Sequence, residues 1–329
     1  MADIGVLGTG SYVPERVVTN DDIAALVPDA TVEWIVRRTG ISTRRWAAPE
    51  QATSDLAARA ATRALASAGL GPGDVDYLIV STSTGDHPQP PTSCLVQTLI
   101  AAPGAACFDI NVVCAGFVYG VELARSLVTA NPGTRALVIG ADVYSRILDF
   151  TDRRTSVLLG DGAGAVVVGE VTGSQGIVAT GLSSYGDACD LIKVVAGGSR
   201  VPATARTVAD GEHFFTMQGR GVRDFVMEGV PTLLQELVTG AGLTLSDVDC
   251  FVPHQANGVL LRELVTKCSL QDAHTALVVD RFGNLGSASV PVALDDAARS
   301  GRLSRDDLVL LSAFGGGMSV GNCLLRWSR

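Results

Sequence analysis

The stretch AGLGPGDVD at residues 68–76 recurs as AGLTLSDVD at residues 241–249, with six of nine positions identical. Each copy follows an Ala- and Leu-rich segment with a helical pattern. Each copy also precedes an apolar segment expected to be a strand, YLIVSTST in the first case and CFVPHQAN in the second. The glycines Gly69 and Gly242 are typical of the position just past the end of a helix. The chain is therefore predicted to contain the same helix–strand unit twice.

The offset of 173 residues between the two copies persists further along the chain. It places Asn111 opposite Asn284 and Cys114 opposite Ser287, so that CFDINVVCAGF and DRFGNLGSASV correspond. The apolar runs RALVIGADV and DLVLLSAFG follow the same offset within about one residue. Any α/β protein repeats helix–Gly–strand units, but four matching segments in one order favour a duplication. We expect two similar halves, residues 1–170 and 171–329.

The predicted strands indicate the fold class. Segments such as YLIV, ALVIG and GAVVVG are continuous apolar runs, which are typical of strands covered on both faces. Both halves are therefore expected to be α/β, with helices around and between two sheets. The polar, Gly-rich segment 187–215 is weakly periodic and is expected to form an excursion over a substrate entrance.

Composition excludes several classes of protein. The 329 residues are 47% hydrophobic and 18% charged, which is typical of a compact globular chain. A net charge of −9 without any basic run argues against a nucleic-acid partner. We find no signal peptide and no apolar stretch near the ~20 residues that span a bilayer. The seven cysteines fit neither a disulfide framework nor a metal site, so a cytoplasmic location without a metal is expected.

Cys114 is the candidate nucleophile. Residues 108–113 are predicted to form a buried strand and a helix is predicted from residue 115, which places Cys114 at the junction. A thiol at a helix N-terminus lies near unpaired N–H groups and the positive end of the helix dipole, and both favour the thiolate. An inert buried cysteine at a tight turn is the alternative interpretation.

Three further motifs accompany the cysteine. His254 in VPHQAN follows a predicted strand, and Asn284 in GNLGSAS lies in the turn that corresponds to the Cys114 turn. Because these are equivalent strand ends of a duplicated fold, we expect them to converge near a pseudo-twofold axis. A structural His, a turn-stabilising Asn and a plain Gly-rich turn at FGGG (314–317) are the alternatives. As a functional motif, FGGG offers backbone N–H groups for half of an oxyanion hole. GDGAGA at 160–165 precedes a strand rather than a helix, so we reject a phosphate loop.

In this order, VVCAGF, VPHQAN, GNLGSAS and FGGG resemble β-ketoacyl-acyl carrier protein synthase III, one of the thiolase-fold condensing enzymes. GTGSYVPE, EWIVRRTGI and GDGAGA also resemble it, and the resemblance runs from about residue 4 to residue 327. It implies a thiolase fold, a duplicated five-layered αβαβα sandwich, that usually forms a homodimer. It also implies an enzyme without a resident cofactor, whose substrates are an acyl-CoA and a malonyl thioester.

The resemblance assigns roles to individual residues. Cys114 becomes the acylated nucleophile with His254 and Asn284 as its partners, and Gly316 shares the oxyanion hole with the Cys114 N–H. The implied reaction loads an acyl group on Cys114 and then condenses it with a malonyl thioester that loses CO₂. His and Asn suit this reaction because two neutral donors facing one oxygen stabilise an enolate.

By the same resemblance, coenzyme A contacts Trp34, Arg38 and Arg153. An indole can stack on adenine and an arginine can pair with phosphate. An ordinary helix residue and two surface salt bridges are the alternatives for these positions. Gln89 stands where a Phe often shapes the primer pocket across the dimer.

The sequence departs from the family pattern where an acyl carrier protein would dock. Val259 replaces an Arg, Asp224 beside Arg223 replaces a basic residue, and a Lys pair is reduced to Lys267. Acyl carrier proteins are acidic, so these losses weaken docking and indicate a specialised relative, such as a polyketide or other secondary-metabolite enzyme. Acyl transfer to an oxygen or nitrogen acceptor without C–C bond formation is the alternative function. A non-catalytic scaffold or binding subunit is the third possible function.

Overall fold

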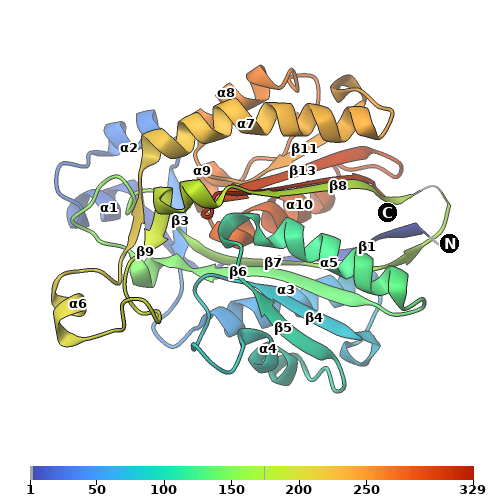
Figure 1. Ribbon diagram of the computed structural model, residues 1–329, viewed down its shortest axis with the longest axis horizontal. Coiled ribbons are helices and arrows are strands. Elements are labelled where there is room, and N and C mark those ends of the chain that lie inside the picture. The colour runs from blue at the N-terminus through green and yellow to red at the C-terminus, as the bar shows by residue number, and fades with distance from the viewer. Residues whose placement is uncertain (1–2, 174) are drawn as a thin grey trace.

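Two five-stranded sheets alternate with three layers of helices (Figure 1). The computed structural model describes residues 3–173 and 175–329. The outer layers are α7 (Gly219–Gly240) with α8 (Gly258–Lys267), and α3 (Thr53–Ala68) with α4 (Thr92–Ile100). The central layer between the sheets is α5 (Gly116–Ala130) with α10 (Ser289–Arg299). The predicted αβαβα sandwich is confirmed.

The two sheets have the same topology. The first has the order β1-β7-β6-β4-β5, and the second, in matching order, is β8-β14-β13-β11-β12. In each sheet the first three strands pair antiparallel and the last three pair parallel. The strands of the first sheet are β1 (Asp3–Tyr12), β7 (Asp161–Val171), β6 (Ala136–Val143), β4 (Tyr77–Ser81) and β5 (Ala106–Ile110). Those of the second are β8 (Gly176–Ser184), β14 (Ser319–Arg326), β13 (Leu308–Gly315), β11 (Cys250–Pro253) and β12 (His274–Thr275).

The aspartates of the repeated motif perform the same two tasks in both halves. Asp74 accepts a hydrogen bond from Gly71 N, and Asp247 accepts one from Thr244 N, each at 2.8 Å. These contacts close the short 3-10 turns that lead into β4 and β11.

The second aspartate of the motif ties neighbouring strands together. Asp76 accepts from Arg135 N just before β6, and Asp249 accepts from Leu308 N at the start of β13, again at 2.8 Å. Each carboxylate therefore aligns two parallel strands. This shared task gives the sequence identity of the two copies a structural reason.

Smaller elements complete the chain at one end of the sandwich. Next to α2 (Val32–Thr39) lie α1 (Asn20–Leu26) and a two-stranded sheet, β2 (Arg16–Thr19) with β3 (Thr43–Trp46). The excursion predicted around residues 187–215 contains β9 (Ile192–Val194), α6 (Ala205–Ala209) and β10 (Phe215–Met217). The short helix α9 (Val279–Phe282) precedes α10.

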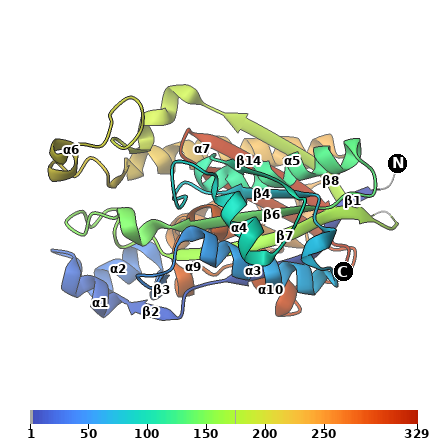
Figure 2. The ribbon, with the colours of Figure 1, turned by 90° about the horizontal axis from the view of Figure 1, so that it is seen from below.

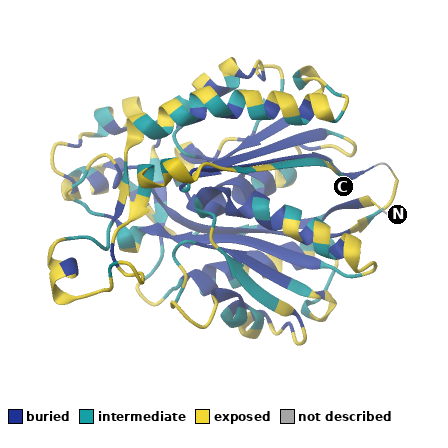
Figure 3. Cartoon of the chain, viewed as in Figure 1, coloured by how far each residue is buried: buried dark blue, intermediate teal, exposed yellow. Residues whose placement is uncertain are grey.

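The core lies on both faces of the sheets. The central strands of both sheets and α10 are mainly buried, whereas the outer face of α7 is exposed (Figure 3). Within the described residues, one helical segment, Val113–Ala130, is long and apolar enough to cross a membrane. The expectation that no stretch approaches that length was therefore wrong. Half of this segment is buried inside the protein, and it packs as α5 between the sheets, as core helices do.

Strand β1 and helix α3 approach so closely that β1 has no room for side chains at two positions. Figure 2 shows α3 lying across the first sheet when the protein is seen from below. A Cβ atom on Gly10 would lie 2.5 Å from Ala60 O, and a Cβ on Gly8 would lie 2.5 Å from Ala64 O. Glycine is required at these positions because backbone atoms of a helix cannot move aside singly.

We predict that Gly10→Ala lowers the free energy of unfolding by about 1–3 kcal/mol, the usual cost of overpacking. Urea denaturation followed by circular dichroism measures it. Gly229→Ala in α7 is the control, because no atom lies within 4 Å of its added Cβ. That variant should be neutral or more stable by up to about 1 kcal/mol. Equal midpoints for Gly10→Ala and the wild type would contradict the close packing.

Candidate active site

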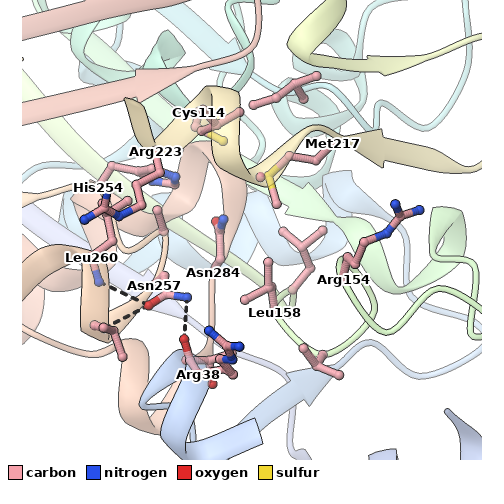
Figure 4. A pocket seen from close by; sticks show the side chains of 18 of the residues that line it. Arg38, Cys114, Arg154, Leu158, Met217, Arg223, His254, Asn257, Leu260 and Asn284 are labelled. Carbon is pink, nitrogen blue, oxygen red and sulfur yellow. Dashed lines mark hydrogen bonds between the residues drawn. The ribbon is translucent and has the colours of Figure 1, made fainter. Parts of the chain in front are cut away.

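A cavity of about 490 Å³ opens where strands of both halves end. Its walls include Cys114 from the first half and His254 and Asn284 from the second (Figure 4). The structure thus brings together the three polar residues that the sequence placed at equivalent strand ends. Trp34, Arg38 and Arg153 also line this cavity.

Cys114 sits in a single 3-10 turn, Val113–Ala115, directly before α5. Its side chain is only 8% exposed. Burial, reinforced by the nearby carboxylate of Asp142, raises the pKa of the Cys114 thiol well above its usual range. The expected stabilisation of the thiolate by the helix N-terminus is therefore wrong for the unliganded site, because desolvation outweighs the dipole. The resting nucleophile is a thiol that must lose its proton during attack.

Gly315 belongs to the FGGG motif, but the sequence analysis gave it no role of its own. A Cβ atom there would lie 2.7 Å from the backbone N of Cys114 and 2.9 Å from its Cβ. The absence of a side chain lets β13 reach the nucleophile turn. Gly316, predicted for the oxyanion hole, is the next residue, and it is Gly315 rather than Gly316 that lines the cavity.

His254 follows β11 and is 2% exposed. Its backbone N–H donates to Ser312 O at 2.7 Å, and its ring meets Phe314 edge-on with centroids 5.3 Å apart. Burial lowers the pKa of His254 to about 3, so the imidazole is neutral at physiological pH. A neutral ring can both accept a proton and donate a hydrogen bond.

The residue after the histidine immobilises this loop. The buried amide of Gln255 donates to Pro253 O at 2.7 Å and to Ala276 O at 3.0 Å. Its Oε1 accepts from Val278 N and Val279 N at 2.9 and 3.1 Å. The four bonds satisfy the amide completely, and they fix the backbone next to His254.

Asn257 connects the histidine loop to the mouth of the cavity. Its Oδ1 caps α8 by accepting from Val259 N and Leu260 N, and its Nδ2 donates to Arg38 O at 3.1 Å (Figure 4). Arg38 belongs to α2, which also carries Trp34. The VPHQAN motif therefore places both the histidine and the helix at the entrance.

The turn of Asn284 is clamped by the first half of the chain. Its N–H donates to Leu158 O, and its carbonyl accepts from Gly160 N, both at 2.9 Å. Its side-chain Oδ1 accepts from Gly286 N at 2.9 Å. Because the oxygen is engaged, the Nδ2 group remains as the donor for a ligand.

The mouth offers groups that suit a nucleotide. The Arg153 guanidinium lies over the Trp34 ring at 4.9 Å from its centroid, and it donates to Asp29 O. Across residues 3–173 and 175–329, neither Arg38 nor Arg153 forms an ion pair, which leaves both charges for a phosphate. The excursion adds Ile192, Phe215 and Met217 to the walls, as expected for a segment over the entrance.

Gln89 does not line the cavity of its own chain. It is exposed, in the loop between β4 and α4. The sequence analysis placed it at a pocket across a dimer, and that assignment stays a prediction.

Known proteins are similar to this one in fold and in sequence. The family model for 3-oxoacyl-acyl-carrier-protein synthase III matches residues 108–186, and the model for the C terminal part of the same enzyme matches residues 238–327. An acetoacetyl CoA synthase, NphT7, of Streptomyces sp. (strain CL190) is 47% identical, with 98% of each chain covered. A β-ketoacyl-acyl-carrier-protein synthase III of Caldanaerobacter subterraneus subsp. tengcongensis is 42% identical, with 99% of this chain and 98% of that protein covered.

A solved structure agrees closely with the present one. The priming β-ketosynthase from the R1128 polyketide biosynthetic pathway superposes with a TM-score of 0.92 at 32% identity, covering 99% of this chain and 97% of the other. The duplicated five-layered fold is that of the thiolase-fold condensing enzymes. Within that class, the chain belongs to the 3-oxoacyl-acyl-carrier-protein synthase III family.

We predict that the His254 ring stays neutral when the pH falls from about 8 to about 5, whereas an ordinary histidine takes up a proton near pH 6.5. The physical reason is the burial that lowers its pKa to about 3. Proton NMR of the imidazole signals measures it, with His254→Ala assigning the resonance. A His254 signal that titrates near pH 6.5 would contradict the buried neutral ring.

Proposed function

We propose that this protein is an acyl-CoA-primed condensing enzyme, which loads an acyl group on Cys114 and joins it to a malonyl thioester with loss of CO₂. One observation carries the proposal. Cys114, His254 and Asn284 line one cavity, and the Asn284 amide is held through its Oδ1, while its Nδ2 bonds to none of the residues that the structure describes. Membership of the synthase III family supports the same reaction.

The first half-reaction is transfer of the acyl group to the cysteine. The Cys114 sulfur attacks the acyl-CoA carbonyl, while the backbone N–H groups of Cys114 and Gly316 hold the oxyanion. The thiol proton passes to the departing CoA thiolate, so that CoA leaves as the free thiol. Trp34, Arg38 and Arg153 bind the nucleotide at the mouth.

The second half-reaction forms the new carbon–carbon bond. The malonyl carboxylate leaves as CO₂, and its electron pair moves into the thioester, whose oxygen accepts hydrogen bonds from His254 and Asn284 Nδ2. The resulting enolate attacks the acyl carbonyl on Cys114 and expels the cysteine thiolate, which is then protonated. Transfer to an oxygen or nitrogen acceptor is not favoured, because it makes no use of the Asn284 donor.

For the extender we propose malonyl-CoA rather than a carrier-bound malonyl group. At the mouth, Val259 is uncharged, and Arg223 is neutralised by Glu263 at 2.6 Å and Asp224 at 3.7 Å. These contacts leave no unpaired charge at Val259 and Arg223, where the sequence analysis expected an acidic carrier protein to dock. The similarity to an acetoacetyl CoA synthase points the same way.

We also propose a cytoplasmic homodimer. The seven cysteines are free thiols, which suits a reducing compartment. The strand predicted as buried at 108–113 is instead β5, a half-exposed strand with an open backbone edge. Open strand edges pair readily, so two β5 strands can join the first sheets of two copies. Such pairing would also bring the Gln89 loop near a second copy.

The function is tested by intact-protein mass spectrometry with acetyl-CoA and other acyl-CoAs, followed by malonyl-CoA. We expect the wild type, and not Cys114→Ala, to gain the acyl mass and then release CO₂ with a β-ketoacyl product. Asn284→Ala should load within about twofold of the wild type but decarboxylate about 100-fold more slowly, the usual cost of one oxyanion donor. Loading without any CO₂ release by the wild type would support acyl transfer to another acceptor instead.

The dimer is tested by sedimentation velocity over a range of protein concentrations. We expect twice the chain mass at micromolar concentration, because pairing satisfies the open β5 edge. Hydrogen–deuterium exchange should then protect the β5 amides more strongly than those of the short strand β12. A monomer at every concentration would refute the proposed pairing.

A further inference from the structure

Asp142 is a fully buried carboxylate at the end of β6. It forms no ion pair with any Lys or Arg in the part of the chain that the structure describes. Burial raises the pKa of its carboxyl to about 6, although hydrogen bonds to the charged form oppose the shift. A buried carboxylate without a counter-ion is costly, so its contacts indicate what it does.

One oxygen of Asp142 holds the segment after β4. Oδ1 accepts from Ser83 N at 2.9 Å, Thr84 Oγ1 at 2.8 Å and Thr82 Oγ1 at 3.2 Å. Ser83 in turn bonds through its hydroxyl to the Tyr144 hydroxyl at 2.9 Å. All of these partners belong to the first half.

The other oxygen holds the second half. Oδ2 accepts from Ser287 N at 2.8 Å. Ser287 lies in the short turn Gly286–Ala288 that follows Asn284 and leads into α10. Gly286 has φ = +58°, and a Cβ there would overlap the Asp142 carboxylate, so this turn rests directly on Asp142.

The same turn orients the Asn284 side chain. Gly286 N donates to Asn284 Oδ1 and Ser287 N donates to Asp142 Oδ2, so consecutive N–H groups connect the amide and the carboxylate. A shift of the turn on Asp142 therefore moves the Asn284 donor. The nucleophile turn lies beside the Gly286–Ala288 turn. Cys114 makes no hydrogen bond to Asp142 among the described residues, and the Asp142 charge raises the pKa of its thiol.

We propose that Asp142 is a positioning residue for the decarboxylation step: its Oδ2 fixes the turn that aims Asn284 Nδ2 at the enolate oxygen. The inference rests on the proposed condensing function. It predicts that loss of the Asp142–Ser287 bond impairs decarboxylation while acyl loading of Cys114 continues.

Asp142→Asn tests that bond selectively. The Oδ1 of the introduced asparagine can keep the bonds to Ser83 and Thr84. Its NH₂ group then faces the Ser287 N–H, and two donors cannot bond to each other. We expect the single-turnover rate of Cys114 acylation to be no lower than about half that of the wild type, because losing the Asp142 charge removes one cause of the raised thiol pKa. Decarboxylation of malonyl-CoA should slow by about 100-fold, because a displacement of ~1 Å in a catalytic group has that effect.

The matched control is Asp295→Asn. Asp295 is equally buried and accepts from Thr9 Oγ1 at 2.8 Å and Ser11 Oγ at 2.5 Å, and it also pairs with Arg299 at 3.7 Å. None of these partners belongs to the turn that follows Asn284. This variant should leave the ratio of the two rates unchanged. In an Asn284→Ala background, Asp142→Asn should cause no further loss of decarboxylation, because coupled residues are not additive.

Equal losses in both steps, no loss in either, or additive effects in the double variant would overturn the proposal. If Asp142→Asn does not fold, Ser287→Pro removes the donated N–H together with the hydroxyl that bonds to Ser81, and it must show the same selective loss. Ser287→Ala, which removes the hydroxyl alone, is its control. Failure of the condensing function itself is distinguishable, because the wild type would then release no CO₂.

Discussion

The burial of α5 and α10 between the two sheets is the constraint on which the rest of the structure depends. Each helix starts at the end of its own half's strands, and each must cover both sheets to hide its apolar surface. The turns that begin the two helices therefore meet at the interface of the halves. A Cβ on Gly140 would overlap Ser287 backbone atoms, which shows how closely the halves approach there. One turn carries Cys114 and the other follows Asn284.

The same burial decides the chemistry of the site. Desolvation keeps Cys114 as a thiol and His254 as a neutral imidazole, so the resting site contains no separated charges at these groups. The reacting side chains are held in place instead by neighbouring groups whose hydrogen bonds are satisfied. Gln255 holds the histidine loop through four hydrogen bonds, and the Gly286 N–H orients the Asn284 amide by donating to its Oδ1. A site with buried, fixed neutral donors suits an enolate, whose charge appears only during the reaction.

The repeated sequence motif predicted much of the fold. Identical residues at an offset of 173 predicted two similar halves, and the paired tasks of Asp76 and Asp249 show that the identity reflects hydrogen bonding. Besides the length of the apolar stretch, two further expectations were wrong because they depend on surroundings. Residues 108–113 were expected to be a buried strand, yet β5 is a half-exposed edge, since nothing beside it in the chain covers it. The Cys114 thiolate was expected from the helix dipole, but burial prevails.

By itself, the sequence determined the duplicated α/β architecture, the order of the motifs and the identity of Cys114, His254 and Asn284 as candidates, because periodicity and polar residues at strand ends are local signals. Only the tertiary structure decided that these residues share one cavity, that Gly315 must lack a side chain beside Cys114, and that Asp142 links both halves beneath Asn284. Contacts between residues far apart in the chain, and the desolvation they cause, leave no pattern in a single sequence.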